Sequence, residues 1–330
     1  MAKAKSQAAA RSREARKAEA ERWNRFLIVG GVAAAILVAL GIIGFGWYQT
    51  QIRPLSKTVL RVGDTKISLA HLERRMRLER AERPFALQGQ NLLQLPDLVL
   101  SQLEVEATLL EGTEELDITV TEEEVDAKIR EEGDLAEDVA PNLFADEYRR
   151  QVEKSGLEPD EYRQMLRARV LGEKVLNYFV FLAPSEEPQV RIRWIIADSE
   201  ERAQQAFWRL ASGEDFAALA KEFSVESSSA EQGGVIEWSP RGTFPIAELE
   251  DFLFQQAEPG QRSEIIASGQ FFYIVELLGR DESRPLDDDQ KRVVGSREMQ
   301  KWLDDMRTKL GIEQDFTQED SIRALNDVLD

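Results

Sequence analysis

Two strand-like runs decide the fold: Val190-Arg191-Ile192-Arg193-Trp194-Ile195-Ile196 and Phe271-Phe272-Tyr273-Ile274-Val275-Glu276-Leu277. β-Branched and aromatic residues dominate both runs, which predicts strands. Between them the sequence indicates two helices and a polar loop, and then four landmarks: Gly233-Gly234, Trp238-Ser239-Pro240-Arg241-Gly242, Glu250-Asp251-Phe252-Leu253-Phe254 and Pro259-Gly260. The rest of the chain is interpreted around this segment.

The order of these landmarks over about ninety residues resembles the parvulin family of peptidyl-prolyl cis-trans isomerases. Specifically, it is similar to the parvulin domains of the exported folding factors SurA, PrsA and PpiD. Gly213-Glu214-Asp215-Phe216 resembles the family's link between its first two helices, and Phe223-Ser224-Val225-Glu226 resembles the start of its active-site loop. The resemblance implies an α+β fold, with a small antiparallel sheet surrounded by helices.

Prolyl isomerisation breaks no covalent bond, because the obstacle is an amide rotation barrier of roughly 18–20 kcal/mol. A catalyst grips the proline ring in an apolar slot and hydrogen-bonds the twisted amide better than the planar one. The resemblance implies catalytic positions at Trp194, Glu226 and Tyr273. Active members of the family carry histidines at the first and last of these positions. We therefore expect weak or absent isomerase activity, and no cofactor.

The resemblance also implies a substrate-binding surface. Phe244 stands where the family has Met or Leu, and Leu249 stands where it has Phe. Trp238 and Phe254 complete the predicted set. We expect these side chains to hold an X-Pro segment of a polypeptide.

A purely structural interpretation of the same residues stays open. Trp194 and Tyr273 lie in strands that face a core, where aromatic residues pack as often as they bind. Phe244 and Leu249 fit a core equally well. Glu226 precedes a run of three serines, which suits a solvated residue better than a functional one. The paired glycines suit positions that require a positive φ or a close backbone approach.

Composition excludes several kinds of site. The chain has 330 residues, no cysteine and one histidine, His71. Disulfides, thiolate metal ligands, a cysteine nucleophile and a lipid-bearing cysteine are therefore excluded. A hydrolase would need a Ser-Lys pair such as one of Ser227 to Ser229 with Lys221, and nothing in the sequence specifies that geometry. Asp287-Asp288-Asp289 lacks the spacing of a calcium loop and suits a helix N-terminus.

An uncharged run of 23 residues extends from Phe26 to Tyr48. Roughly 20 apolar residues cross a bilayer as a helix, whereas the apolar core of a cleaved signal peptide is usually about 7–15 residues long. Trp47 and Tyr48 at its end suit an interfacial aromatic belt. We therefore predict a single uncleaved transmembrane helix.

Charge predicts the orientation of this helix. Residues 1–25 contain eight basic and three acidic residues, a net charge of +5, which by the positive-inside rule keeps this end in the cytoplasm. A nucleic-acid-binding arm is the alternative interpretation of the basic segment. The whole chain carries −19, so the part beyond Arg25 carries −24 and repels phosphate backbones. We expect localisation in the cell membrane, with most of the chain outside the cytoplasm and no nucleic-acid partner.

Helical periodicity dominates the residues before the parvulin-like segment. Leu100, Leu103, Ala107 and Leu110 recur at spacings of three and four. This region resembles the chaperone domain of the SurA and PrsA group. The predicted segments are a basic cytoplasmic segment (1–25), a transmembrane helix (26–48), a linker (49–57), a helical chaperone-like domain (58–185), an inserted parvulin-like domain (186–282), a C-terminal helix that packs back onto the chaperone-like domain (283–312) and an acidic peripheral tail (313–330).

These features predict a membrane-anchored extracytoplasmic folding factor. Its partners would be unfolded or newly exported polypeptides. The alternative is a non-catalytic scaffold of the cell envelope, which would bind one fixed partner through the aromatic residues Trp194, Phe244 and Tyr273.

Overall fold

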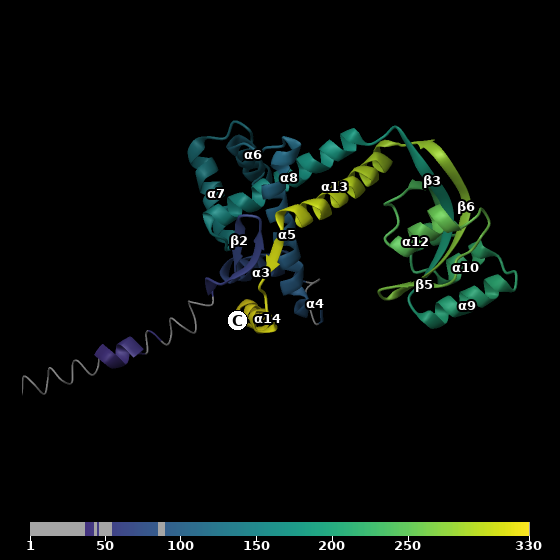
Figure 1. Cartoon of the computed structure of the whole chain (residues 1–330), viewed down its shortest axis with the longest axis horizontal. Helices are drawn as coiled ribbons and strands as arrows, with labels where there is room; N and C mark the ends of the chain where they lie inside the picture. The colour runs from purple at the N-terminus through teal and green to yellow at the C-terminus, as the bar shows by residue number, and fades with distance from the viewer. Residues whose placement is uncertain (1–36, 43–44, 46–54, 85–89, 330) are drawn as a thin grey trace, which may run out of the picture. The chain divides into compact units, whose positions relative to one another are not determined.

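A computed structural model describes residues 37–42, 45, 55–84 and 90–329 (Figure 1). Their contacts group into two compact units. The first unit contains the residues up to Arg61, residues 66–100 and the C-terminal residues from 314; the second contains residues 62–65 and 101–313.

The predicted transmembrane segment falls mostly outside the described residues. Of Phe26–Tyr48, only residues 37–42 and 45 are described; they are helical, and Leu37 is 70 % exposed. Within the described ranges, no helix combines the length and the apolar character needed to cross a bilayer.

A strand-turn-strand motif surrounds Gly63-Asp64. It consists of β1 (Thr58–Val62) and β2 (Thr65–Ser68), which belong to a three-stranded sheet of order β2-β1-β7, where β7 is Ile312–Gln314. The helix α3 (Leu69–Glu82) follows directly. Ser68 caps it, since its hydroxyl accepts a hydrogen bond of 3.2 Å from the backbone N–H of His71. The short helix α4 (Gln90–Leu93) lies in the same unit.

The expectation of a peripheral acidic tail is wrong. Residues 318–329 form the helix α14 (Gln318–Leu329), which packs against α3. Ala324 and Val328, four residues apart, are buried on its inner side. Asp320 anchors the helix through an ion pair of 2.8 Å with Lys57. The high acidic content of the segment masked this narrow apolar stripe.

A helical region forms one part of the second unit, and it includes one helix, α13 (Asp288–Leu310), that follows the sheet in the chain. Thr121 and Glu124 form a capping box at the start of α6 (Glu122–Glu132), and Pro159 lies in the first turn of α8 (Pro159–Leu182). Leu109, Leu171, Val175 and Leu303 form an apolar cluster between three of the helices. The other helices are α5 (Leu95–Gly112), η2 (Thr113–Leu116) and α7 (Pro141–Ser155), and α13 packs along α8.

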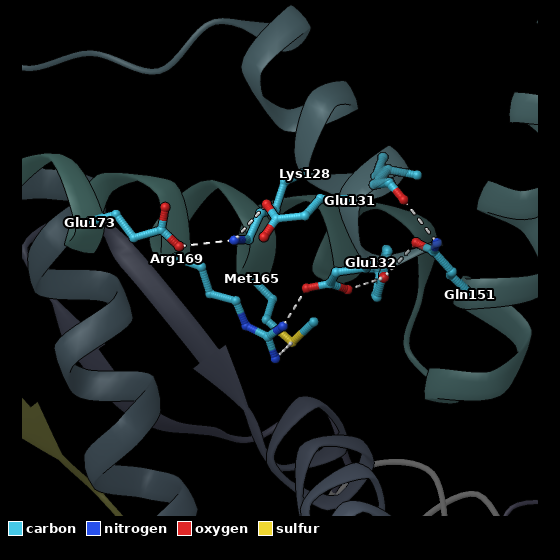
Figure 2. A network of polar contacts seen from close by, with 9 residues as sticks. Lys128, Glu131, Glu132, Gln151, Met165, Arg169 and Glu173 are labelled. Carbon is cyan, nitrogen blue, oxygen red and sulfur yellow. Dashed lines mark hydrogen bonds and ion pairs between the residues drawn. The ribbon is translucent and has the colours of Figure 1, made fainter. Parts of the chain in front are cut away.

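A polar network connects α6, α7 and α8 (Figure 2). Lys128 of α6 reaches Glu173 of α8 at 2.9 Å. Arg169 of α8 pairs with Glu132 of α6 at 2.7 Å. The hydroxyl of Tyr162 lies 3.0 Å from Glu132, and its pKa is raised by burial and by that carboxylate. Gln151 of α7 donates to the carbonyl of Ile129 at 3.0 Å and accepts from the Tyr162 hydroxyl at 2.9 Å, so the network links all three helices.

The predicted small antiparallel sheet is confirmed. Its order is β4-β3-β6-β5, with antiparallel pairing throughout. The predicted strands form the central pair, in which Trp194 lies opposite Val275 and Ile196 lies opposite Tyr273. The elements are β3 (Glu186–Ala197), α9 (Glu200–Ala211), α10 (Phe216–Phe223), α11 (Ser227–Ala230), β4 (Val235–Pro240), α12 (Ala247–Asp251), η3 (Phe252–Gln256), β5 (Ile266–Ser268) and β6 (Phe271–Pro285).

Helices cover both faces of this sheet (Figure 1). On one face, α9 and α10 pack against Ile195 and Ile274. On the other face, α12 and η3 pack against Ile192 and Val275. Successive side chains of a strand point to opposite faces, so β3 contributes to both cores.

Candidate functional site

Three aromatic side chains meet on the sheet face covered by α12. The ring centroid of Trp194, on β3, lies 6.1 Å from that of Phe244 and 6.3 Å from that of Tyr273, on β6. The Trp194 and Phe244 rings are nearly perpendicular, at 77°. These are the separations that favourable aromatic pairs adopt. We call Trp194, Phe244 and Tyr273 the aromatic cluster.

A polar relay borders the aromatic cluster. The indole N–H of Trp194 donates a 2.9 Å hydrogen bond to the hydroxyl of Ser229. Ser229 in turn donates to the Glu226 carboxylate through its hydroxyl and through its backbone N–H, the latter at 3.1 Å. Glu226 is thereby the N-cap of α11. Since an indole has a single donor, Trp194 has none left for a ligand.

The glycine pair allows the strand after α11 to approach β3. Gly233 and Gly234 have φ angles of 75° and 80°. The carbonyl of Gly234 accepts a 2.9 Å hydrogen bond from the backbone N–H of Trp194. A Cβ atom at Gly234 would collide with the carbonyl oxygen of Trp194. Both reasons given for the glycines, a positive φ and a close approach, therefore hold here.

Glu250 fixes the loop that carries Phe244. One oxygen of its carboxylate accepts hydrogen bonds from the backbone N–H groups of Gly242, at 2.6 Å, and Phe244, at 3.3 Å. Gly242 has a φ of 95°. Glu250 lies in α12, so the helix and the loop are held together. The sequence alone did not identify this role.

The structure brings some predicted binding residues to the aromatic cluster and separates another from it. Leu249 is fully buried in the core beneath the cluster, so it supports the site by packing. Phe254 is half-buried at the same core, with the guanidinium of Arg241 4.7 Å from its ring. Trp238 packs elsewhere, beside Gly279, with the guanidinium of Arg284 4.7 Å from its ring.

Ser229 is a second residue that the sequence did not single out. It is 5 % exposed and joins Trp194 to Glu226. The signal was present as the run Ser227-Ser228-Ser229, but nothing in the sequence distinguishes one serine from the next. Only the third faces the indole.

The arrangement offers apolar side chains and one tyrosine hydroxyl. Tyr273 is 8 % exposed and Phe244 is 5 % exposed, whereas Trp194 is only partly buried. No hydrogen bond joins the Tyr273 hydroxyl to another residue described by the structure. In the described parts of the chain no group of histidine, aspartate and glutamate side chains is arranged to hold a metal ion. Phe244 and Tyr273 belong to the buried apolar core, so the partly buried Trp194 supplies the apolar surface beside the Tyr273 hydroxyl.

Comparisons with known proteins agree with this architecture. Residues 17–176 match the SurA-like N-terminal domain, and residues 187–279 match the PPIC-type PPIASE domain. The chain is 28 % identical over 189 residues to foldase protein PrsA 4 of Bacillus cereus, a match that covers 56 % of this chain and 64 % of that protein. It is 25 % identical over 249 residues to foldase protein PrsA of Caldanaerobacter subterraneus. This match covers 68 % of this chain and 76 % of that protein.

Among solved structures, the parvulin domain of PpiD from E. coli is 37 % identical. The likeness covers 29 % of this chain and 92 % of that domain, with a TM-score of 0.26. The chain spans less than two thirds of the length of the Bacillus cereus relative. The two domain matches follow each other without overlap, as the helical region and the sheet do in the structure. The chain belongs to the parvulin family, in the group whose PPIC-type domain follows a SurA-like N-terminal domain.

Proposed function

We propose that this chain is a membrane-anchored extracytoplasmic folding factor that binds X-Pro segments of exported polypeptides and isomerises them weakly. The observation that carries the proposal is the aromatic cluster on one face of the sheet, with the Trp194 donor already bound to Ser229. The cluster supplies apolar contact for a proline ring. Tyr273 supplies the hydrogen bond to the twisted amide.

Weak catalysis follows from how the donors are used. Rate acceleration needs a hydrogen bond that is stronger in the twisted state than in the planar state. Trp194 donates its N–H to Ser229, and Glu226 accepts from Ser229, so both act by positioning the indole. Tyr273 remains as the one donor of the set. A single hydroxyl replaces the pair of histidines that the family resemblance implies.

The helical region would hold unfolded polypeptide. Its match to the SurA-like N-terminal domain and the similarity of the chain to PrsA foldase proteins support this role. The uncharged run Phe26–Tyr48 supports a membrane anchor, and the exposed apolar side chains of residues 37–42 are consistent with one. We assign residues 1–25 to the cytoplasm because of their net charge of +5, from eight basic and three acidic residues.

Isomerisation of a prolyl peptide by the full-length protein in detergent micelles tests the catalytic part. NMR exchange spectroscopy measures the cis-trans rate, and chemical-shift changes measure binding. We expect the natural protein to bind the peptide with little acceleration. The double variant Trp194→His, Tyr273→His should accelerate exchange by about tenfold or more, since one additional hydrogen bond to the twisted amide is worth about one power of ten. Absence of peptide binding, or a natural protein that is faster than the variant, would contradict the proposal.

Suppression of aggregation tests the holding part. The full-length protein should keep a chemically unfolded, proline-free client soluble, since the helical region acts independently of proline. A protein that neither holds the client nor binds the prolyl peptide would not be a folding factor.

The scaffold alternative is favoured by the same internal hydrogen bond of Trp194. This bond leaves a rigid aromatic surface with few hydrogen-bond donors for catalysis. A cross-linked pull-down from membranes distinguishes the two functions. Many clients in small amounts support the folding factor, and one stoichiometric partner supports the scaffold.

A further inference from the structure

A groove of about 760 Å³ lies within the second unit, along α13. Leu176 of α8 and Val293 of α13 line it with apolar surface. Arg292 and Lys301 of the same helix line it with exposed cations. Gly242, from the loop after β4, closes one side. The groove thus combines an apolar lining with positive charge.

The groove is held in shape by hydrogen bonds between α13 and the sheet. The Arg297 guanidinium forms a bidentate pair with Glu187, at 3.0 and 2.8 Å, and donates to the carbonyl of Arg241 at 3.2 Å. Gln290 donates to the carbonyl of Trp238 at 2.7 Å. A guanidinium that binds in this forked manner fixes both partners. The lining is therefore preformed, which lowers the entropic cost of binding.

The charge that the groove offers to a ligand is positive. Arg297 is neutralised by Glu187, a contact that also raises its pKa. The carboxylate of Asp304 accepts hydrogen bonds from Arg307 at 2.7 Å and from Gln300 at 3.1 Å. Arg292 and Lys301 form no ion pair with any other described residue. Two cations thus remain unmatched in a chain whose net charge is −19.

We propose that this groove is a second polypeptide-binding site, which takes an extended segment whose apolar side chains alternate with carboxylates. The apolar residues would contact Leu176 and Val293, and the carboxylates would pair with Arg292 and Lys301. A polypeptide fits better than a nucleic acid, because the acidic chain repels a polyphosphate and a phosphate backbone makes no use of the apolar lining.

The groove lies next to the aromatic cluster along the chain. Gly242 lines the groove and Phe244 belongs to the cluster, and the Cα atoms of residues two apart are at most about 7 Å from each other. One extended client can therefore contact both sites. The inference rests on the proposed function only in that the ligand is a polypeptide, because the groove itself makes no use of proline.

Fluorescence anisotropy with the full-length protein in detergent micelles tests the groove. The probe is a fluorescein-labelled, proline-free decapeptide of alternating Leu and Glu. The variant Arg292→Gln, Lys301→Gln should bind it about tenfold more weakly, since two charge-assisted contacts are lost. The control Lys291→Gln, Lys309→Gln removes the same charge from the same helix outside the groove, and its affinity should stay within about twofold.

The chemistry of the probe provides the second comparison. A decapeptide of alternating Leu and Gln should bind the natural protein about as weakly as the Leu-Glu peptide binds the groove variant. Equal losses in the groove variant and in the control would overturn the proposal, because they would indicate a general charge effect. So would binding of phosphatidylserine vesicles, but not of the peptide, through Arg292 and Lys301.

A Trp194→Phe variant separates this proposal from the proposed function. It alters the aromatic cluster and leaves the groove intact, so the affinity for the Leu-Glu peptide should not change. Unchanged affinity of the variant for both peptides would refute the proposed role of the cluster alone. Loss of affinity for both peptides would refute the groove alone, because the Leu-Glu peptide would then bind at the cluster.

Discussion

The two faces of the four-stranded sheet differ in how they are closed. One face is covered by α9 and α10, whose apolar residues pack on Ile195 and Ile274 (Figure 1). The other is covered by the short segments α12 and η3 together with the loop of Phe244. We call these the scaffold face and the site face. Both are apolar, but the polar contacts differ: the site face has the Trp194-Ser229-Glu226 relay, and the scaffold face has the Arg193–Glu276 ion pair.

The difference shows how one strand can serve stability and binding at once. Arg193 and Ile195 point to the scaffold face, and Trp194 between them points to the site face. The alternation of side chains in a strand makes this division possible. Substitutions on the scaffold face should therefore change the free energy of unfolding most. Substitutions on the site face should change ligand binding more than stability.

The largest effect is expected for Leu219→Ala on the scaffold face. Leu219 is fully buried in α10 between the helices and the sheet. Its truncation leaves a cavity and should lower the free energy of unfolding by about 3 kcal/mol. Hydrogen exchange of peptides from β3 and β6 in the full-length protein measures the loss. A change below about 1 kcal/mol would mean that this face does not carry the stability.

The second-largest loss in the free energy of unfolding is expected for Arg193→Met. Arg193 donates to Glu276 at 2.7 Å and lies with its guanidinium 4.4 Å from the Phe216 ring. Glu276 is 7 % exposed, so removing its partner should cost about 2 kcal/mol. The same hydrogen-exchange measurement applies.

Arg191→Met is the matched control for that substitution. Arg191 is two residues away on the same strand and pairs with Glu237, but the two side chains are 40 % and 72 % exposed. An exposed ion pair is screened by solvent, so the control should leave exchange rates unchanged. Equal effects of the two substitutions would show that burial of Glu276 is not what gives Arg193 its importance.

A smaller loss of stability is expected for Trp194→Phe on the site face. The variant keeps an aromatic ring and removes the N–H that Ser229 accepts. The cost should be about 1 kcal/mol, the usual value of one neutral hydrogen bond. The free energy of prolyl-peptide binding should weaken by more than the free energy of unfolding does, since the orientation of the ring is no longer fixed. NMR titration measures the affinity, and an unchanged affinity would assign Trp194 to packing alone.

Local patterns predicted much of the fold. The central strands followed from their β-branched and aromatic residues, and the buried face of α5 followed from the spacing of Leu100, Leu103 and Ala107. The predicted strand Phe271–Leu277 is shorter than β6, which continues to Pro285. The extension is polar, and it becomes a strand through its pairing with residues 186–191 of β3. A pairing between distant segments leaves no local signal in the sequence.

The site was predicted less completely. The meeting of Trp194 with Tyr273 followed from the family resemblance, but the place of Trp238 did not. β4 has one extra residue opposite β3, so Ile236 faces the aromatic core while Trp238 does not. Such a bulge shifts the alternation of side chains and leaves no trace in the hydrophobic pattern. The role of Glu250 was not predicted, because its partners are backbone N–H groups, which every residue except proline carries.

The smallest effect concerns a buried carboxylate with poorer pairing than Glu276. Glu73 of α3 is 3 % exposed, and its ion pair with Arg323 is long, at 3.9 Å. Burial raises its pKa above the ordinary value of 4.5, and the charge of Asp327 adds to the shift. The folded chain then holds this proton more tightly than the unfolded chain does. Above pH 4.5 stability therefore falls as the pH rises toward the raised pKa of the folded state.

Glu73→Gln should consequently stabilise the protein slightly, by less than any of the losses above. The gain should be complete above the raised pKa and should vanish below pH 4.5, where Glu73 is protonated in both states. Thermal unfolding of both proteins across pH 4–8 measures it. The corresponding Glu276→Gln substitution should destabilise, because that carboxylate has Arg193 at 2.7 Å and Arg262 at 3.7 Å. Effects of the same sign would mean that burial, and not pairing, decides the outcome for both carboxylates.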